Sequence, residues 1–214
     1  MPDDHAPPEI AAEPPARGRG RPIGDRDARR TELLRAAVSV IAREGLAGAS
    51  LRKVAQHAGC TTGAVTYYFD SREAMVAAVA ENLFDQFDLT LGLGRRLDLR
   101  TGFRRWLDWA EAEDSDAWLA GFQLLAHARH EPALAAIYQR RYARYRQVLA
   151  EMLAQAQSEG TVRDDIPADL LADHLGAIGD GWMMMLPIEP ERFTPSRIQA
   201  LLDAMQTLVA PPAR

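Results

Sequence analysis

The stretch from Cys60 to Met75, "CTTGAVTYYFDSREAM", gathers hydroxyl-bearing side chains that a short helix would display outward. Hydroxyls bond to phosphate oxygens and base edges, a threonine methyl fits a thymine methyl, and a glycine lets a backbone approach closely. Val65 and Phe69 interrupt the polar run at a spacing that lets both pack inward. The candidate nucleic-acid contacts in this stretch are Thr61, Thr62, Gly63, Thr66, Tyr67 and Tyr68.

The charge distribution supports a nucleic-acid contact in the same region. The net charge is −5, yet residues 17–69 hold ten Lys and Arg against four acidic residues. A basic block on an acidic remainder is typical of a local nucleic-acid footprint. The alternatives are a chance excess of charge on a solvated face and an ordinary surface helix with chance hydroxyls. Further predicted contacts within the block are Ser50, Arg52 and Lys53.

A second set of side chains, aromatic and methionine-rich, lies in the C-terminal half and includes Trp118 and Met183–Met185. On helices around a cavity, such a set forms an adaptable apolar pocket, and an aromatic box beside Asp180 would suit a cation. For any single residue, plain core packing is the alternative. The predicted pocket residues are Trp106, Trp109, Phe122, His127, Tyr138, Tyr142, His174, Asp180 and Trp182.

Catalytic and metal-binding chemistry is only weakly indicated. His127 and His130 stand one helical turn apart near Glu131, and such a pair can hold a metal, but no H-E-x-x-H pattern is present. Cys60 has no obvious base beside it, and the sequence holds no G-x-S-x-G, phosphate loop or dinucleotide fingerprint. We therefore expect no enzyme, no metal site and no cofactor; a helical metal-dependent enzyme is the remote alternative.

The elements that position these residues read as helices throughout, because apolar residues recur at helical spacing and no window alternates with period two. We predict an all-α fold of about nine helices, divided into a disordered basic arm (1–24), a helix-turn-helix DNA-binding domain (25–70) and a helical ligand-binding and dimerisation domain (71–211). The expected helices span about 27–45, 51–58, 61–69, 71–92, 100–111, 115–129, a long helix from 132, 168–186 and 195–209.

Two short helices separated by Gly59 have the outline of a helix-turn-helix, whose second helix enters the DNA major groove. Together with the flanking helices, the stretch "LRAAVSVIAREGLAGASLRKVAQHAGCTTGAVTYYFDSREAM" resembles the N-terminal domain of TetR-family transcriptional regulators. The glycine after the first helix, the "xVAxxAG" helix and the "GxxxxYF" recognition helix fall at the family's spacings. Where the family commonly has Tyr then His, this chain has Thr66 and Tyr68, so base preference does not carry over.

The resemblance implies an Ω-shaped homodimer that represses transcription and leaves its operator DNA when a small molecule fills a C-terminal pocket. It also implies that Arg72 matches a phosphate-contacting lysine. A DNA-binding regulator without a ligand is the alternative, distinguished by the absence of a connected cavity. The effector is not identified by the sequence. Separately, the single cysteine and an N-terminus without the apolar region of a secretory signal predict a cytoplasmic location.

The N-terminal arm contains "RGRGRP", with Arg19 and Arg21, which resembles an AT-hook. Glycine lets such a segment lie deep in a narrow A·T-rich minor groove, whose negative potential attracts arginine. A flexible basic tail with nonspecific phosphate contacts is the alternative.

Dimerisation is predicted from the two final helices, which have wide apolar stripes, with Gly176 and Gly179 allowing a close approach. The residues expected at that interface are Leu171, Leu175, Ile178, Leu201, Leu202 and Met205. A single cysteine fits a reducing compartment, and no apolar run approaches the roughly 20 residues that cross a bilayer, so no membrane partner is expected.

Overall fold

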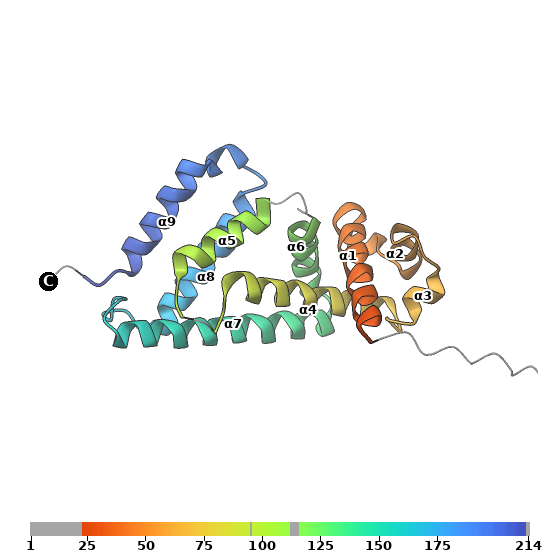
Figure 1. Ribbon diagram of the computed structural model, residues 1–214, viewed down its shortest axis with the longest axis horizontal. Coiled ribbons are helices and arrows are strands. Elements are labelled where there is room, and N and C mark those ends of the chain that lie inside the picture. The colour runs from red at the N-terminus through yellow and green to blue at the C-terminus, as the bar shows by residue number, and fades with distance from the viewer. Residues whose placement is uncertain (1–22, 95, 112–115, 213–214) are drawn as a thin grey trace, which may run out of the picture.

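The computed structural model describes residues 23–94, 96–111 and 116–212, and within these ranges the fold is entirely helical (Figure 1). This confirms the all-α prediction. The described elements are α1 (Ile23–Gly48), α2 (Leu51–His57), α3 (Thr62–Thr66), α4 (Arg72–Leu91), α5 (Leu99–Glu111), α6 (Asp116–Ala128), α7 (Pro132–Ser158), α8 (Ala168–Met185), the short 3₁₀ helix η1 (Pro190–Phe193) and α9 (Pro195–Val209).

The first three helices form a compact unit because their apolar stripes meet. Leu33 and Ile41 of α1, Val54 of α2 and Val65 of α3 are all fully buried against one another in one core. Side-chain oxygens satisfy the open N–H groups at three helix starts: Ser50 accepts from Lys53, Thr61 from Ala64 and Ser71 from Ala74.

Two helices differ from the sequence expectation by more than one residue at an end. α1 begins at Ile23 instead of Asp27, and it continues to Gly48 through Gly45, whose φ of 77° interrupts regular helix geometry. α3 ends at Thr66 instead of Phe69, because Tyr67 and Tyr68 already form a turn that brings Phe69 back into the core. α3 is therefore shorter than predicted.

The apolar core of the N-terminal unit crosses the predicted boundary at residue 70. Ala120 and Leu124 of α6 and Leu134 of α7 belong to the same buried cluster as the residues of α1 and α3. α6 lies beside α1 in Figure 1, and α4 runs from the N-terminal unit along α7. A second core joins α5, α7, α8 and α9. Helices α4, α6 and α7 therefore connect the N-terminal unit to the rest of the molecule. No helix among the described residues is both long and apolar enough to cross a membrane.

Candidate DNA-binding surface and ligand cavity

The outer face of α3 presents the hydroxyl-rich residues that the sequence singled out. Thr61, Thr62, Gly63, Thr66 and Tyr67 are exposed, Tyr68 is half-buried, and Val65 and Phe69 are buried beneath them. Tyr67 keeps 66% of its surface exposed, packs edge-on against Tyr68 and lies under the guanidinium of Arg26 at 5.4 Å. The hydroxyl of Thr66 donates to the Gly63 carbonyl at 3.1 Å and keeps its acceptor lone pairs for other partners.

The basic residues around α3 have intramolecular partners. Lys53 pairs with Glu44, and the Ser50 hydroxyl caps α2, while Arg52 is exposed. Arg72 donates from Nε to the Ala49 carbonyl at 2.8 Å and from Nη2 to the Leu46 carbonyl at 2.6 Å. The guanidinium that the resemblance assigned to phosphate contact thus also holds the end of α1 to the start of α4. Arg19 and Arg21 lie outside the described residues.

A cavity of about 380 Å³ lies among α4, α5, α6, α7 and α8. Its wall includes three of the four tryptophans of the chain. Six predicted pocket residues line it: Trp106, Trp109, Phe122, Tyr138, Tyr142 and Asp180. The remaining lining residues are Leu83, Phe84, Phe87, Ala117, Trp118, Gly121, Leu125, Tyr145, Gly181, Met183 and Met184.

Three predicted pocket residues lie outside this cavity. His127 bonds through Nδ1 to the Gln123 carbonyl of its own helix, and His174 is exposed. Trp182 packs against Phe103 at 5.7 Å between ring centroids. Residues two apart on a helix point to opposite sides, whereas residues three and four apart share a face. Asp180 therefore shares the cavity face of α8 with Met183 and Met184, and Trp182 cannot.

Phe84 and Phe87 were missed because their helix, α4, was interpreted only as a linker out of the DNA-binding unit. Both residues belong to the apolar stripe of α4. The sequence shows that such a stripe faces inward, but it does not show whether the stripe packs in a core or lines a cavity. Phe87 lies 5.4 Å from Trp106 and 5.7 Å from Tyr145, and Phe84 lies 5.8 Å from Tyr142, measured between ring centroids. The cavity is therefore walled by interlocking aromatic rings from three helices.

The polar groups of the cavity are few. The Tyr138 hydroxyl donates to the Gly121 carbonyl at 2.9 Å, and the Tyr142 hydroxyl lies 3.5 Å from a carboxylate oxygen of Asp180, at the outer limit of a hydrogen bond. Desolvation raises the pKa of Tyr138, Tyr142 and Tyr145 above the ordinary value for tyrosine.

Asp180 is an exposed residue whose carboxyl lies at the wall of the cavity, where the surrounding protein desolvates it in part. Its pKa is raised by that desolvation and lowered in part by the Tyr142 hydroxyl. The indole N–H groups of Trp106 and Trp118 have no hydrogen-bond partner among the described residues. Buried indole N–H groups normally find a partner, so this wall has unused donor capacity.

Comparison with known proteins agrees with this arrangement. Residues 33–79 match the family model described as bacterial regulatory proteins, tetR family. Residues 95–208, more than half of the chain, match the model for the C-terminal domain of BetI-type transcriptional repressors. The chain belongs to the TetR family of transcriptional regulators.

Individual relatives support the same assignment along most of the chain. A helix-turn-helix transcriptional repressor of Mycobacterium tuberculosis is 27% identical over 183 residues, which cover 85% of this chain and 93% of that protein. The crystal structure of a transcriptional regulator from Rhodococcus is 26% identical, with a TM-score of 0.68, and the match covers 84% of this chain and 95% of that one. A regulator from Saccharomonospora viridis, solved in complex with choline, is 22% identical, with a TM-score of 0.65, and the match covers 83% of this chain and 95% of that one.

The TetR family comprises regulators and not enzymes. Among the residues that the structure describes, no cluster of three or more His, Cys, Asp and Glu is arranged to hold a metal.

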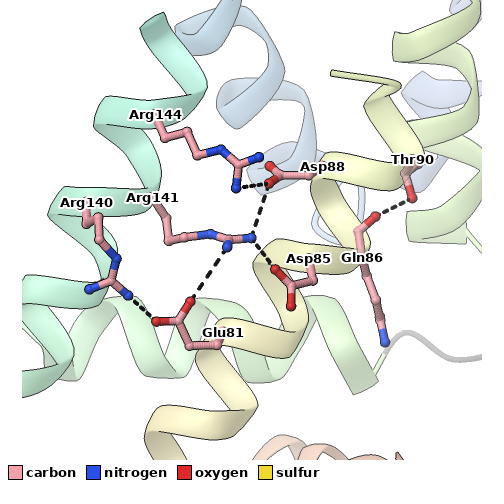
Figure 2. A network of polar contacts seen from close by, with 8 residues as sticks. All are labelled: Glu81, Asp85, Gln86, Asp88, Thr90, Arg140, Arg141 and Arg144. Atoms are coloured by element: carbon pink, nitrogen blue, oxygen red, sulfur yellow. Dashed lines mark hydrogen bonds and ion pairs between the residues drawn. The ribbon is translucent and has the colours of Figure 1, made fainter. Parts of the chain in front are cut away.

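In this TetR-family chain, α4 is fastened to α7 by an ionic network beside the cavity (Figure 2). Arg141, only 10% exposed, approaches Glu81 at 3.7 Å, Asp85 at 2.6 Å and Asp88 at 3.2 Å. Its guanidinium also lies over the ring of Phe84, a lining residue, at 5.5 Å. Two neighbouring arginines extend the network, Arg140 to Glu81 and Arg144 to Asp88.

The other connection runs from α6 to α1. The Ser39 hydroxyl donates to Asp116 at 2.7 Å, Arg43 pairs with the same carboxylate at 3.5 Å, and Gln123 donates to the Ala42 carbonyl at 3.1 Å. Trp118 and Phe122 of the same helix line the cavity, with their rings 4.4 Å apart. Helix α6, which forms part of the cavity wall, is thus hydrogen-bonded to α1, the first helix of the DNA-binding unit.

TetR-family proteins form dimers as well as bind DNA. The structure shows how far the residues predicted for the dimer interface are exposed in the protomer. Four of the six predicted dimer residues are buried inside the protomer: Leu171, Leu175, Leu202 and Met205. The widest apolar stripe of each helix covers the protomer's own core, so a partner cannot cover these side chains as well. Ile178 and Leu201 are half-buried. Large apolar side chains exposed on α8 and α9 include Leu170 and Leu208.

Proposed function

We propose that the chain is a transcriptional repressor that leaves its operator when a small molecule fills the cavity among α4 to α8. The observation that carries this proposal is that two helices belong to both sites. α4 and α6 line the cavity, and each also packs directly on α1 of the DNA-binding unit. A change in cavity occupancy therefore acts on the placement of the unit that reads DNA.

On the DNA side, we assign direct base contacts to Thr62 and Thr66, since their short polar side chains are exposed on the outer face of α3. Tyr67 and Tyr68 contact phosphates, assisted by Ser50, Arg52, Lys53, Thr61 and the backbone at Gly63. Phosphate contacts set the register of the protein on the duplex, whereas base contacts supply specificity. Arg72 acts first as a brace between α1 and α4.

The dimer sets the distance between the two DNA-binding units. In dimeric helix-turn-helix proteins the two recognition helices lie about one DNA turn apart, roughly 34–36 Å, or a multiple of that distance. We place the dimer contact on the exposed sides of α8 and α9, through Ile178, Leu201, Leu170 and Leu208. A ligand that favours another spacing then releases DNA by shifting the population of conformations. This role requires access to chromosomal DNA, so we place the protein in the cytoplasm.

A DNA-binding regulator without a ligand is the competing function. The cavity volume of about 380 Å³ falls within the range of about 300–1,000 Å³ typical of small-molecule sites, whereas close-packed cores leave few voids larger than a water molecule. The similar fold of a regulator solved in complex with choline also supports a ligand site here. We therefore favour the ligand-responsive form.

The test fills the cavity without knowledge of the natural ligand. In a Cys60→Ser background, Met184→Cys places a single thiol on the cavity wall, and N-benzylmaleimide attaches an apolar group there. Ala154→Cys, on the exposed side of α7, is the matched control. Duplexes selected by the unlabelled protein from random DNA serve as the operator in fluorescence anisotropy.

We expect the label at position 184 to weaken operator binding by about 5- to 150-fold, the usual range of allosteric coupling, and the label at position 154 to leave it unchanged. Unchanged operator affinity with a fully labelled Met184→Cys variant would show that the cavity and the DNA-binding unit are uncoupled, and the proposed function would fall.

A further inference from the structure

The cavity has a pronounced charge asymmetry. Among the described residues that line it, Asp180 is the only acidic one, and none is a lysine, arginine or histidine. Partial desolvation disfavours the ionised form of this carboxyl, and a counter-ion offsets that cost. The cavity thus lacks a counter-ion of its own.

The arginines that adjoin Tyr142 and Tyr145 in α7 pair with other carboxylates. Arg141 points to Glu81, Asp85 and Asp88 of α4, and Arg146 lies 3.8 Å from Asp173. The groups of α7 that lie near Asp180 are instead Tyr142, whose hydroxyl is 3.5 Å from the carboxylate, and Tyr145. A guest that neutralises Asp180 must therefore bring its own positive charge.

Aromatic faces surround the same part of the cavity. Tyr145 packs on Phe87, and Phe87 packs on Trp106, with centroid separations of 5.7 and 5.4 Å. The negative faces of such rings attract cations within about 6 Å, most strongly for tryptophan and tyrosine. The rings and the carboxylate therefore favour the same guest, a cation.

The rest of the wall calls for an apolar body on that cation. Tyr138 lies one helical turn from Tyr142, with ring centroids 6.4 Å apart, and its hydroxyl is held by the Gly121 carbonyl of α6. Beyond it stand Trp118, Phe122 and Leu125 of α6. A small cation that fits only against Asp180 would leave these apolar side chains uncovered.

We propose that the effector is a hydrophobic organic cation, an amine or quaternary ammonium attached to an apolar body, whose charge lies against Asp180 and the Tyr142 and Tyr145 rings. Its apolar body extends toward Trp118 and Phe122. This assignment rests on the proposed function, because it concerns the same cavity.

The experiment compares probes that differ in charge but little in size. They are phenylpropyltrimethylammonium, the neutral dimethylamide of phenylbutanoic acid, the phenylbutanoate anion, and tetramethylammonium as the cation without an apolar body. Quenching of the cavity tryptophans reports binding. Each probe is titrated into the full chain, into Asp180→Asn and into Asp173→Asn, a matched change on an exposed part of the same helix.

We expect phenylpropyltrimethylammonium to bind at least about tenfold tighter than the amide and than tetramethylammonium. Asp180→Asn should remove most of the preference for the cation over the amide, and Asp173→Asn should retain it. Equal binding of cation and amide to the unmodified chain, tighter binding of the anion, failure of the cation to bind at millimolar concentration, or an unchanged preference in Asp180→Asn would each overturn the assignment.

Two results separate this proposal from the proposed function. Operator release by the amide or the anion would keep the ligand-responsive repressor and remove the cation. Selective cation binding without any change in operator affinity would keep the cation site and remove the ligand response.

Discussion

Gly179 of α8 lies against the Trp106 ring of α5 beside the cavity, and replacing it with alanine tests this packing directly. An added Cβ would lie 2.5 Å from Cζ3 and 2.9 Å from Cη2 of Trp106, and 3.3 Å from Cε1 of Phe103. Carbon atoms prefer a separation of about 3.5–4.0 Å, so the indole must move by about 1 Å. Trp106 is only 4% exposed and lines the cavity, so the open direction is into the cavity itself.

Overpacking of this kind costs about 1–3 kcal/mol, and alanine regains about 1 kcal/mol over glycine as a helix former. Gly181→Ala is the matched control, since a Cβ there meets no atom within 4 Å and only the helix gain remains. The two variants should therefore differ by about 1–3 kcal/mol in the free energy of unfolding, or about 2–12 °C in Tm for a chain of this size.

Thermal unfolding followed by circular dichroism at one fixed protein concentration measures the difference, because Tm of a dimer depends on concentration. Gly179→Ala should also weaken binding of any cavity ligand, since the indole moves into its space. Equal Tm values for the two variants would show that Trp106 does not pack on Gly179 as described.

Four further outcomes are expected. Tyr67→Phe should weaken binding equally on selected and random DNA, whereas Thr62→Ala should also change base preference; anisotropy on both duplexes distinguishes them, and equal losses for Thr62→Ala would remove it from the base contacts. Arg72→Met should lower the free energy of unfolding in urea by about 1–3 kcal/mol, because two carbonyls at the end of α1 lose a charged donor. Asp180→Asn should raise Tm at pH 7 but have little effect near pH 4. Desolvation raises the folded-state pKa of this carboxyl, so the wild-type chain loses stability as the pH rises above about 4, the ordinary pKa of an aspartate. The asparagine variant does not ionise and therefore does not lose stability in this way. Leu208→Glu should yield a folded monomer in light scattering, and an unchanged dimer would move the interface away from this side of α9.

Local signals accounted for most of the helix positions. Ser50, Thr61 and Ser71 were each followed by a helix, because a side-chain oxygen there accepts from the first open N–H groups. Pro195 and Val209 bound the last helix as predicted. The end of α3 could not be placed in the same way, since it depends on Phe69 reaching a core formed by residues of other helices.

The pocket was predicted only in part, because the sequence gives the residue types but not which side chains point into the cavity. The sequence correctly assigned Tyr138 and Tyr142, which are one helical turn apart, and the acidic residue Asp180 to the pocket. Phe84 was not assigned to the pocket, and Trp182 was wrongly expected on the same face as Asp180. Which of these side chains meet depends on how five helices cross, and no local signal encodes that.

The sequence by itself determined that the chain is helical, that its basic block contains a helix-turn-helix, and that hydroxyls such as those of Thr62 and Tyr67 face outward. These properties depend on neighbours within about one helical turn. The tertiary structure decided that Asp180 lies among aromatic rings, that Arg141 fastens α4 to α7, and that Leu202 belongs to the protomer's own core. Those properties depend on contacts between residues far apart in the chain, where an apolar stripe looks the same whether it faces a core, a cavity or a partner.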